Sequence, residues 1–190
     1  MENLTNISHC RITRSSILLD GKTVFKAERS FSDLSEFFKS VYRALGMDYK
    51  KFFKMDTLSQ AAIIGTEYLN NTTGFNQRYK EDEIGIVFGN RSSSLTTDVN
   101  YQSTISDFPS PGLFVYTLPN ISIGEVAIRH RISGENVFFV LDNYDDELFE
   151  QYVDILMSNQ SLKCCIAGWI ETNEKDPDIH FTLVEKQGDS

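Results

Sequence analysis

Three thiols are the side chains of this chain best suited to act as a covalent nucleophile. Cys10 follows His9, and Cys164 and Cys165 stand together in the apolar run 163–171. A cysteine inside an apolar strand usually behaves as a small hydrophobic residue. Because successive residues of a strand point to opposite faces, at most one of Cys164 and Cys165 can point into a given pocket.

Histidines supply the general base that such a nucleophile needs, and the chain has His9, His130 and His180. A Cys/His pair formed with His130 or His180 stays an open alternative, because the two groups need only be close in space. No G-x-S-x-G, P-loop, G-x-G-x-x-G or H-E-x-x-H motif occurs, and we therefore expect no cofactor.

An acidic run extends from Asp142 to Glu147. We expect these carboxylates to cap a structural helix, since negative charge is favourable at a helix N-terminus. A Ca²⁺ or Mg²⁺ site is the lesser alternative, because the run lacks the glycine and the terminal spacing of a calcium loop. The expectation is therefore that the chain holds no metal.

Size and charge limit the class of protein. A chain of 190 residues, 41% hydrophobic and 24% charged, suits a single domain over residues 1–190. The net charge of -9 argues against nucleic acid or an anionic membrane surface as a partner. No secretory signal and no run of about 18 apolar residues is found, so we expect a cytoplasmic protein without a membrane span.

Apolar periodicity and turn residues predict the elements that position these groups. The expected architecture is a layered α/β domain with a mostly parallel central sheet covered by helices. The pattern predicts a hairpin at Asp20-Gly21, helices at 34–45, 51–70, 120–131 and 145–158, strands at 83–90, 137–141, 163–171 and 181–184, and a polar loop or loosely packed helix at 91–107.

Four segments resemble β-ketoacyl synthases. Residues 109–136 are similar to the run that precedes the nucleophilic cysteine of that family: the F, T, L, P and N of P-x-x-F-x-x-T-L-P-N are present, and Gly134-Glu135-Asn136 stands in the place of G-P-N. The helix motif R-M-s-x-x-x-x-x-A-x-x-A resembles 54–62. The motif i-G-v-v-v-G resembles 83–90, and a-l-a-G-G-x-e resembles 163–171.

The resemblance runs from about Lys51 to Glu171 and implies the N-terminal half of a ketosynthase, a thiolase-like half domain with 3-oxoacyl-carrier-protein synthase ancestry. It places the expected nucleophile near Asn143, where no cysteine stands. The histidines that a ketosynthase takes from its second half have no counterpart in the chain. The expected catalytic residues are therefore absent, and condensation chemistry is expected to be lost.

Two functions of different class follow. The first is a non-catalytic subunit, a structural or chain-length partner of a complete synthase in bacterial fatty-acid or polyene biosynthesis, where the family has such small members. The alternative is an enzyme that transfers or hydrolyses acyl groups with a relocated nucleophile at Cys10, Cys164 or Cys165.

Two surfaces are expected to meet partners. In ketosynthases the strand after G-P-N pairs across a two-fold axis, and here that strand is Asn136, Val137, Phe138, Phe139, Val140 and Leu141. It has no charge or proline to block edge pairing, which predicts a homodimer or a heterodimer with a complete ketosynthase. The local positive cluster is either a solvated helix face or a docking site for an acidic acyl carrier protein, and it consists of Arg43, Lys50, Lys51 and Lys54.

Overall fold

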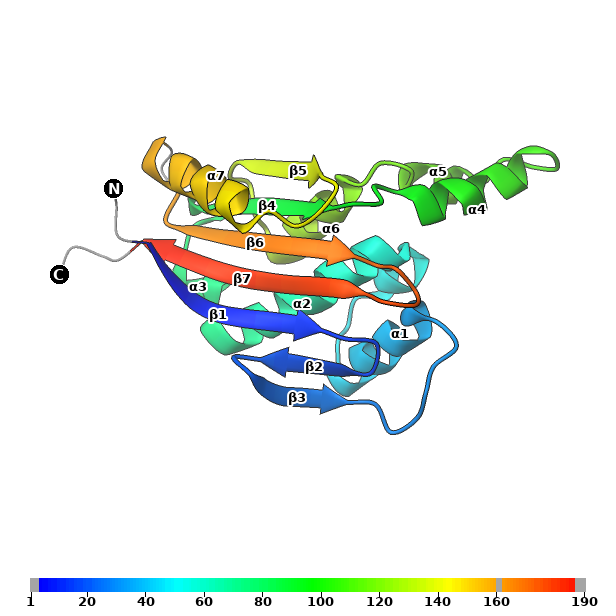
Figure 1. Ribbon diagram of the computed structural model, residues 1–190, viewed down its shortest axis with the longest axis horizontal. Coiled ribbons are helices and arrows are strands. Elements are labelled where there is room, and N and C mark those ends of the chain that lie inside the picture. Colours follow the sequence, from blue (N-terminus) through cyan, green and yellow to red (C-terminus); the bar gives the residue numbers. More distant parts are fainter. Residues whose placement is uncertain (1–3, 160–161, 187–190) are drawn as a thin grey trace.

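One seven-stranded sheet organises the structure, a computed structural model that describes residues 4–159 and 162–186 (Figure 1). The strand order is β3-β2-β1-β7-β6-β4-β5. The strands are β1 (Leu4–Ile12), β2 (Ser16–Leu19), β3 (Lys22–Lys26), β4 (Ile84–Asn90), β5 (Asn136–Val140), β6 (Cys164–Glu171) and β7 (Asp178–Lys186).

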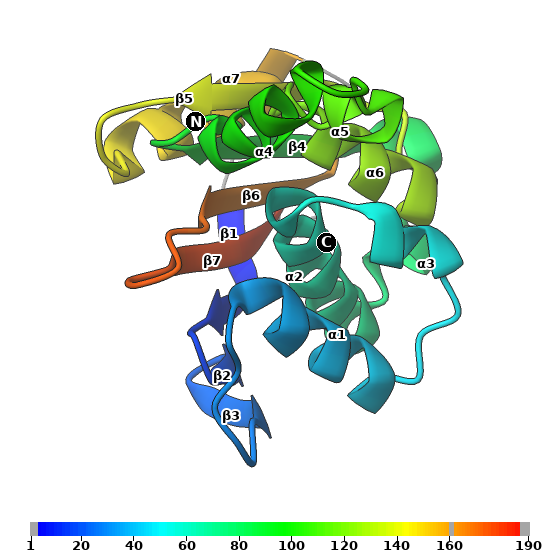
Figure 2. The ribbon, with the colours of Figure 1, turned by 90° about the vertical axis from the view of Figure 1, so that its right-hand side faces the viewer.

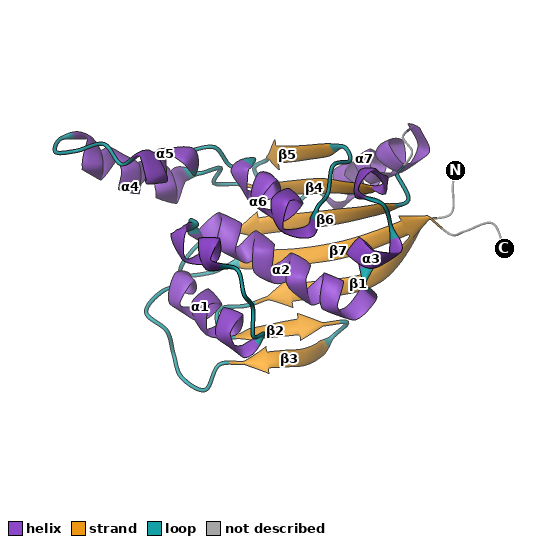
Figure 3. Ribbon diagram, turned by 180° about the vertical axis from the view of Figure 1, so that it is seen from behind, coloured by secondary structure: helices purple, strands orange, loops and turns teal. Residues whose placement is uncertain are grey.

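Helices cover the two faces of this sheet unequally. The α-helices are α1 (Leu34–Ala44), α2 (Thr57–Thr73), α3 (Phe75–Arg78), α4 (Leu95–Ile105), α5 (Pro111–Val115), α6 (Ile121–His130) and α7 (Asp146–Asn159), and the 3₁₀ turns are η1 (Lys50–Lys54) and η2 (Glu81–Glu83). Helices α1, α2 and α6 lie behind the sheet, whereas α7 lies in front of it (Figures 1 and 3). No helix in the described parts is long and apolar enough to span a membrane.

The prediction of a mostly parallel sheet is wrong. Strands β1–β2, β2–β3, β1–β7 and β6–β7 pair antiparallel, and among the described strands only β4 pairs in parallel, with β5 and with β6. The antiparallel pairs β1–β2, β2–β3 and β6–β7 are joined by short turns, which cannot carry the chain back to a parallel start. The strands that helices separate, β4, β5 and β6, do run in one direction.

Two apolar cores form on the two sides of the sheet. The larger contains the inner faces of α1, α2 and α6 and the strand residues that point toward them; α1 and α2 lie together on that side (Figure 2). The smaller lies between α7 and the other face, around Val87, Phe149, Val153 and Trp169. Cys164 belongs to the larger core and Cys165 to the smaller, as the strand period requires.

Helix α2 approaches the sheet more closely than a side chain would allow. A Cβ atom added at Gly65 would overlap the ring of Phe181 on β7. A Cβ atom at Gly168 on β6 would lie 2.6 Å from Phe181 Cδ1. The ring of Phe181 therefore fills the space that these two glycines leave open, and it is fully buried.

Local signals explain most element ends. Asp33 caps α1 by accepting the amide of Glu36 at 2.8 Å. The Asp20-Gly21 turn joins β2 to β3 with both residues at positive φ, which suits these two residue types. The expected helix over 51–70 is divided, because Asp56 is extended and caps α2 by accepting the amide of Ser59 at 2.9 Å.

Two segments lie at the surface. Among the described strands β5 pairs only with β4, so it forms an edge of the sheet, and Val140 is 52% exposed. The polar run 91–107 contains α4, which projects with α5 beyond the end of the sheet (Figures 1 and 3). We call residues 95–118, which contain α4 and α5, the arm.

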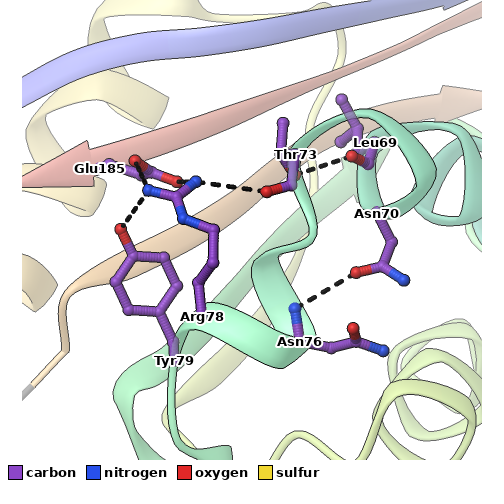
Figure 4. Close-up of polar contacts among 7 residues, drawn as sticks. All are labelled: Leu69, Asn70, Thr73, Asn76, Arg78, Tyr79 and Glu185. Atoms are coloured by element: carbon purple, nitrogen blue, oxygen red, sulfur yellow. Dashed lines mark hydrogen bonds and ion pairs between the residues drawn. The ribbon is translucent and has the colours of Figure 1, made fainter.

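A bidentate ion pair fixes α3 to the end of the sheet (Figure 4). The guanidinium of Arg78 donates to the buried carboxylate of Glu185 on β7, at 2.7 Å to Oε1 and 2.9 Å to Oε2. It also donates to Tyr79 Oη at 3.2 Å and to the carbonyl of Thr73 at 3.4 Å. Two parallel bonds to one carboxylate set position as well as charge, so the exit from α2 is held against β7.

Candidate functional site

The turn between β5 and α7 contains Asn143, near which the sequence resemblance places the expected nucleophile. Asn143 is exposed there, between Asp142 and Tyr144. Asp145 Oδ1 accepts the amide of Leu148 at 3.0 Å and so caps α7, in the way expected for this acidic run. The helix N-terminus that would stabilise a thiolate thus carries a carboxylate instead.

Aromatic rings pack against one another beside this turn. The ring of Tyr144 lies 4.5 Å from that of His180, 5.2 Å from that of Phe149 and 5.8 Å from that of Trp169. Its hydroxyl donates to Asp146 at 2.9 Å, and burial together with this carboxylate raises the pKa of Tyr144. Trp169 stands where the a-l-a-G-G-x-e element has its second glycine, so an indole occupies room that a glycine would leave free.

The three thiols lie inside the protein. Cys10, Cys164 and Cys165 each have no exposed surface. Burial, with Asp20 as a second cause, raises the pKa of Cys10 to about 12, and burial alone raises the pKa of Cys165 to about 12. Burial also raises the pKa of Cys164, with smaller electrostatic effects from its neighbours. Thiols of this kind are almost entirely protonated near neutral pH and are poor nucleophiles.

The histidines sit in two separate places. His9 and His180 lie on neighbouring strands with their rings 6.1 Å apart, and His9 Nδ1 is 3.0 Å from Thr182 Oγ1. His130 is buried at the end of α6 against Phe75, and burial lowers its pKa to about 4. Among the described residues no hydrogen bond joins a histidine to a thiol. The Cys/His alternative thus finds no assembled dyad.

A polar cavity that the sequence did not predict opens beyond the ends of β4 and β6, with a volume of about 460 Å³. The buried carboxylate of Glu171 accepts the amides of Arg91 and Ser92, each at 3.0 Å, and the hydroxyl of Ser92 at 2.7 Å. The sequence analysis did not single out Glu171, although the acidic last position of the a-l-a-G-G-x-e element could have indicated it. Glu171 holds the turn from β4 into the arm.

Asp56 forms the opposite wall of that cavity. Besides capping α2, it accepts the hydroxyl of Thr97 on α4 at 3.0 Å, and burial raises its pKa. The cavity has three acidic groups, Asp56, Glu171 and Glu174. Each is bound by donors of the protein itself, because Glu174 Oε2 also accepts a hydrogen bond, from the amide of Leu34 at 3.0 Å. The hydrogen bonds of Asp56 and Glu171 position the base of the arm. Together these bonds leave none of the three carboxylates free to act as a general base in the cavity.

Comparison with solved structures identifies the fold. The ishigamide ketosynthase/chain length factor superposes with a TM-score of 0.67 at 16% identity, over 98% of this chain and 63% of its own. A ketosynthase in complex with its chain length factor, from Xenorhabdus doucetiae, gives 0.57 at 14% identity, over 99% and 80%. The chain has the ketosynthase fold.

A third ketosynthase structure has the same fold as this chain. A type II PKS acyl-carrier protein in complex with its ketosynthase, bound to the hexaketide, gives a TM-score of 0.62 at 13% identity, over 98% of this chain and 63% of that one. No protein-family model and no curated protein matches. The chain spans less than two thirds of the length of the first structure. The ketosynthase resemblance read from the sequence is thus confirmed as a fold.

The positive cluster of this ketosynthase-like chain lies on α1 and η1. Arg43, Lys50, Lys51 and Lys54 are all exposed. Lys51 is already engaged, because its Nζ lies 2.7 Å from Oε2 of the buried Glu125 on α6. The other Glu125 oxygen accepts the hydroxyl of Tyr116 at 3.0 Å. Lys51 therefore compensates a buried charge, which distinguishes it from the other three cations.

The burial of the thiols gives a direct test. We expect native protein at pH 8 to react with the disulfide reagent DTNB at least about a hundredfold more slowly than unfolded protein, because a raised pKa leaves little thiolate and burial blocks access. Absorbance of the released thiolate measures the rate. Protein in guanidinium is the control and should show all three thiols, Cys10, Cys164 and Cys165. A native thiol that reacts as fast as free cysteine would contradict this.

Proposed function

We propose that the chain is a non-catalytic ketosynthase-like subunit, a structural or chain-length partner of a complete ketosynthase. The nucleophile position carries this proposal: Asn143 occupies the turn, Asp145 caps the following helix, and Tyr144 and Trp169 fill the adjacent space. A pathway of bacterial fatty-acid or polyene synthesis is consistent with the family resemblance. One similar structure, a ketosynthase in complex with its chain length factor, gives a precedent for such a pair.

The free edge of β5 supports the proposed pairing. Leu141 N donates to Asn90 O, and Glu135 O accepts from Ile86 N, so odd-numbered residues bond to β4. Backbone groups alternate in direction along a strand. The backbone groups of Asn136, Phe138 and Val140 therefore point away from β4 and are available to a second chain.

The arm supports it as well. Within residues 95–118, the large apolar side chains that are at least 44% exposed are Leu95, Val99, Ile105, Phe108, Phe114, Val115 and Leu118. From 92 to 128 the chain contains no lysine, arginine or histidine. Exposed apolar groups with few charges are typical of the core of a protein interface. We propose that β5 and the arm together face the partner.

The lost nucleophile leads to a test of activity. The isolated protein should not condense malonyl-carrier protein with an acyl thioester, because the position near Asn143 offers no thiol and the buried thiols are protonated. Product formation by mass spectrometry, with a complete ketosynthase as the positive control, measures this. Condensation or acyl transfer that is abolished by Cys165→Ala would contradict the proposal and establish the relocated-cysteine enzyme instead.

The edge of β5 leads to a test of assembly. We expect a dimer, of the chain with itself or with a complete ketosynthase, and we expect Val140→Pro to weaken it by about tenfold or more, since proline removes an outward N–H and is tolerated on an edge strand. Val140→Thr keeps the N–H and the shape and is the matched control. Sedimentation equilibrium measures the dissociation constant.

Position 140 suits this experiment better than Phe139. The Phe139 ring packs against Phe149 and Tyr152 of α7, at 5.9 and 5.1 Å, so a change there would also damage the core. If the wild-type protein stays monomeric at high concentration, alone and with ketosynthases of its source organism, the pairing proposal fails.

The positive cluster leads to a test of carrier-protein docking. We propose that an acidic acyl carrier protein docks on Arg43, Lys50 and Lys54. Reversing Lys50 and Lys54 to Glu should lower the association rate by about tenfold at low salt and by less at physiological salt, because opposite charges mainly accelerate encounter. Lys51 is kept, since its loss would leave Glu125 buried and unpaired.

Stopped-flow fluorescence with labelled carrier protein gives the association rate. Reversing Lys22 and Lys26, which are exposed on β3, changes the net charge equally and is the matched control. An equal effect of both double variants, or no carrier-protein binding at low salt, would show that the cluster is an ordinary solvated surface.

A further inference from the structure

The front face of the sheet is only partly covered. Helix α7 lies over the side of the sheet that contains β4 and β5, and within residues 4–159 and 162–186 no helix lies in front of β1 or β7 (Figure 1). A groove of about 380 Å³ runs between α7 and these two strands. It is separate from the edge of β5 and from the arm, so it is not explained by the assembly proposed above.

The groove combines an apolar floor with an acidic wall. Leu4, Ala167 and Val184 from the strands and Phe149 and Val153 from α7 supply the apolar lining. The wall carries Asp146, Glu150 and Asp154. These three residues follow each other at intervals of four on one helix, so they form a line of carboxylates about 12 Å long.

This line of carboxylates is costly for α7 by itself. Like charges four residues apart on a helix repel one another and disfavour the helix. A cation placed along the wall would remove the repulsion between Asp146, Glu150 and Asp154. The charge of the wall thus excludes acidic partners, anionic lipid and nucleic acid from the groove and favours a positively charged one.

We propose that this groove binds a cationic amphipathic helix of a partner protein. A helix laid alongside α7, at the usual interaxial distance of about 8–10 Å, would cover the bare strands. Its apolar stripe would meet the floor at the partly exposed Leu4 and Ala167, and its lysine or arginine side chains would meet the acidic wall. This arrangement is the helix-in-groove mode of recognition.

A synthetic peptide tests the proposal. The probe is a labelled peptide of about 18 residues, with leucines at helical spacing on one face and lysines beside them. We expect saturable binding by fluorescence anisotropy that weakens as salt is raised, because screening reduces charge attraction. Combining Glu150→Gln with Asp154→Asn should weaken binding by about tenfold.

Two controls separate the groove from general acidity. Combining Asp142→Asn with Glu147→Gln removes the same charge near or on α7 outside the groove and should leave binding nearly unchanged. A scrambled peptide of equal composition has no apolar stripe and should bind at least about tenfold more weakly. Equal weakening by both double variants, equal binding of the scrambled peptide, or no binding at low salt would overturn the proposal.

A second copy of the chain is the competing occupant of the groove. Sedimentation of the Glu150→Gln, Asp154→Asn variant decides this, because loss of self-association in that variant would assign the groove to a homodimer and overturn the proposed partner helix. Unchanged self-association, together with weaker peptide binding, is the result expected.

Discussion

The packing of one phenylalanine ring against two glycines determines how closely α2 lies on the sheet. Phe181 lies at the middle of β7, which is itself near the middle of the sheet, and its ring occupies the space above Gly168 and against Gly65 of α2. Interiors of this density transmit a change in volume to their neighbours. The depth at which α2 sits, and with it the place of Asp56 and of Arg78 beyond the two ends of α2, depends on that contact.

Local signals in the sequence predict the helices and turns. The pairing of strands that are far apart in the chain could not be predicted from such signals. The Asp20-Gly21 turn and the apolar spacing of α7 determine structure within a few residues, and the sequence predicted both elements. The direction of β7 depends on its insertion between β1 and β6, which no local pattern records. The division of 51–70 at Asp56 was missed because the apolar spacing continues across the cap.

The resemblance predicts a nucleophile position near Asn143, but only the fold shows what surrounds that turn. Tyr144 and Trp169 are 25 residues apart in the chain and His180 is further still, yet their rings meet around the turn. The same holds for Lys51, which the sequence placed in a surface cluster and the structure pairs with Glu125. The sequence shows that a lysine is present, but it does not show which carboxylate that lysine contacts.

The pairing of Leu4 with Lys186 brings the first and the last described strands side by side. The backbone therefore enters and leaves the sheet at the same end, opposite the arm (Figure 1). A tag, linker or neighbouring domain joined to either end would emerge from one point, remote from α4 and α5. Covalent tethering at this end would leave the arm unobstructed, and a short linker would suffice to close the chain into a circle or to reopen it elsewhere.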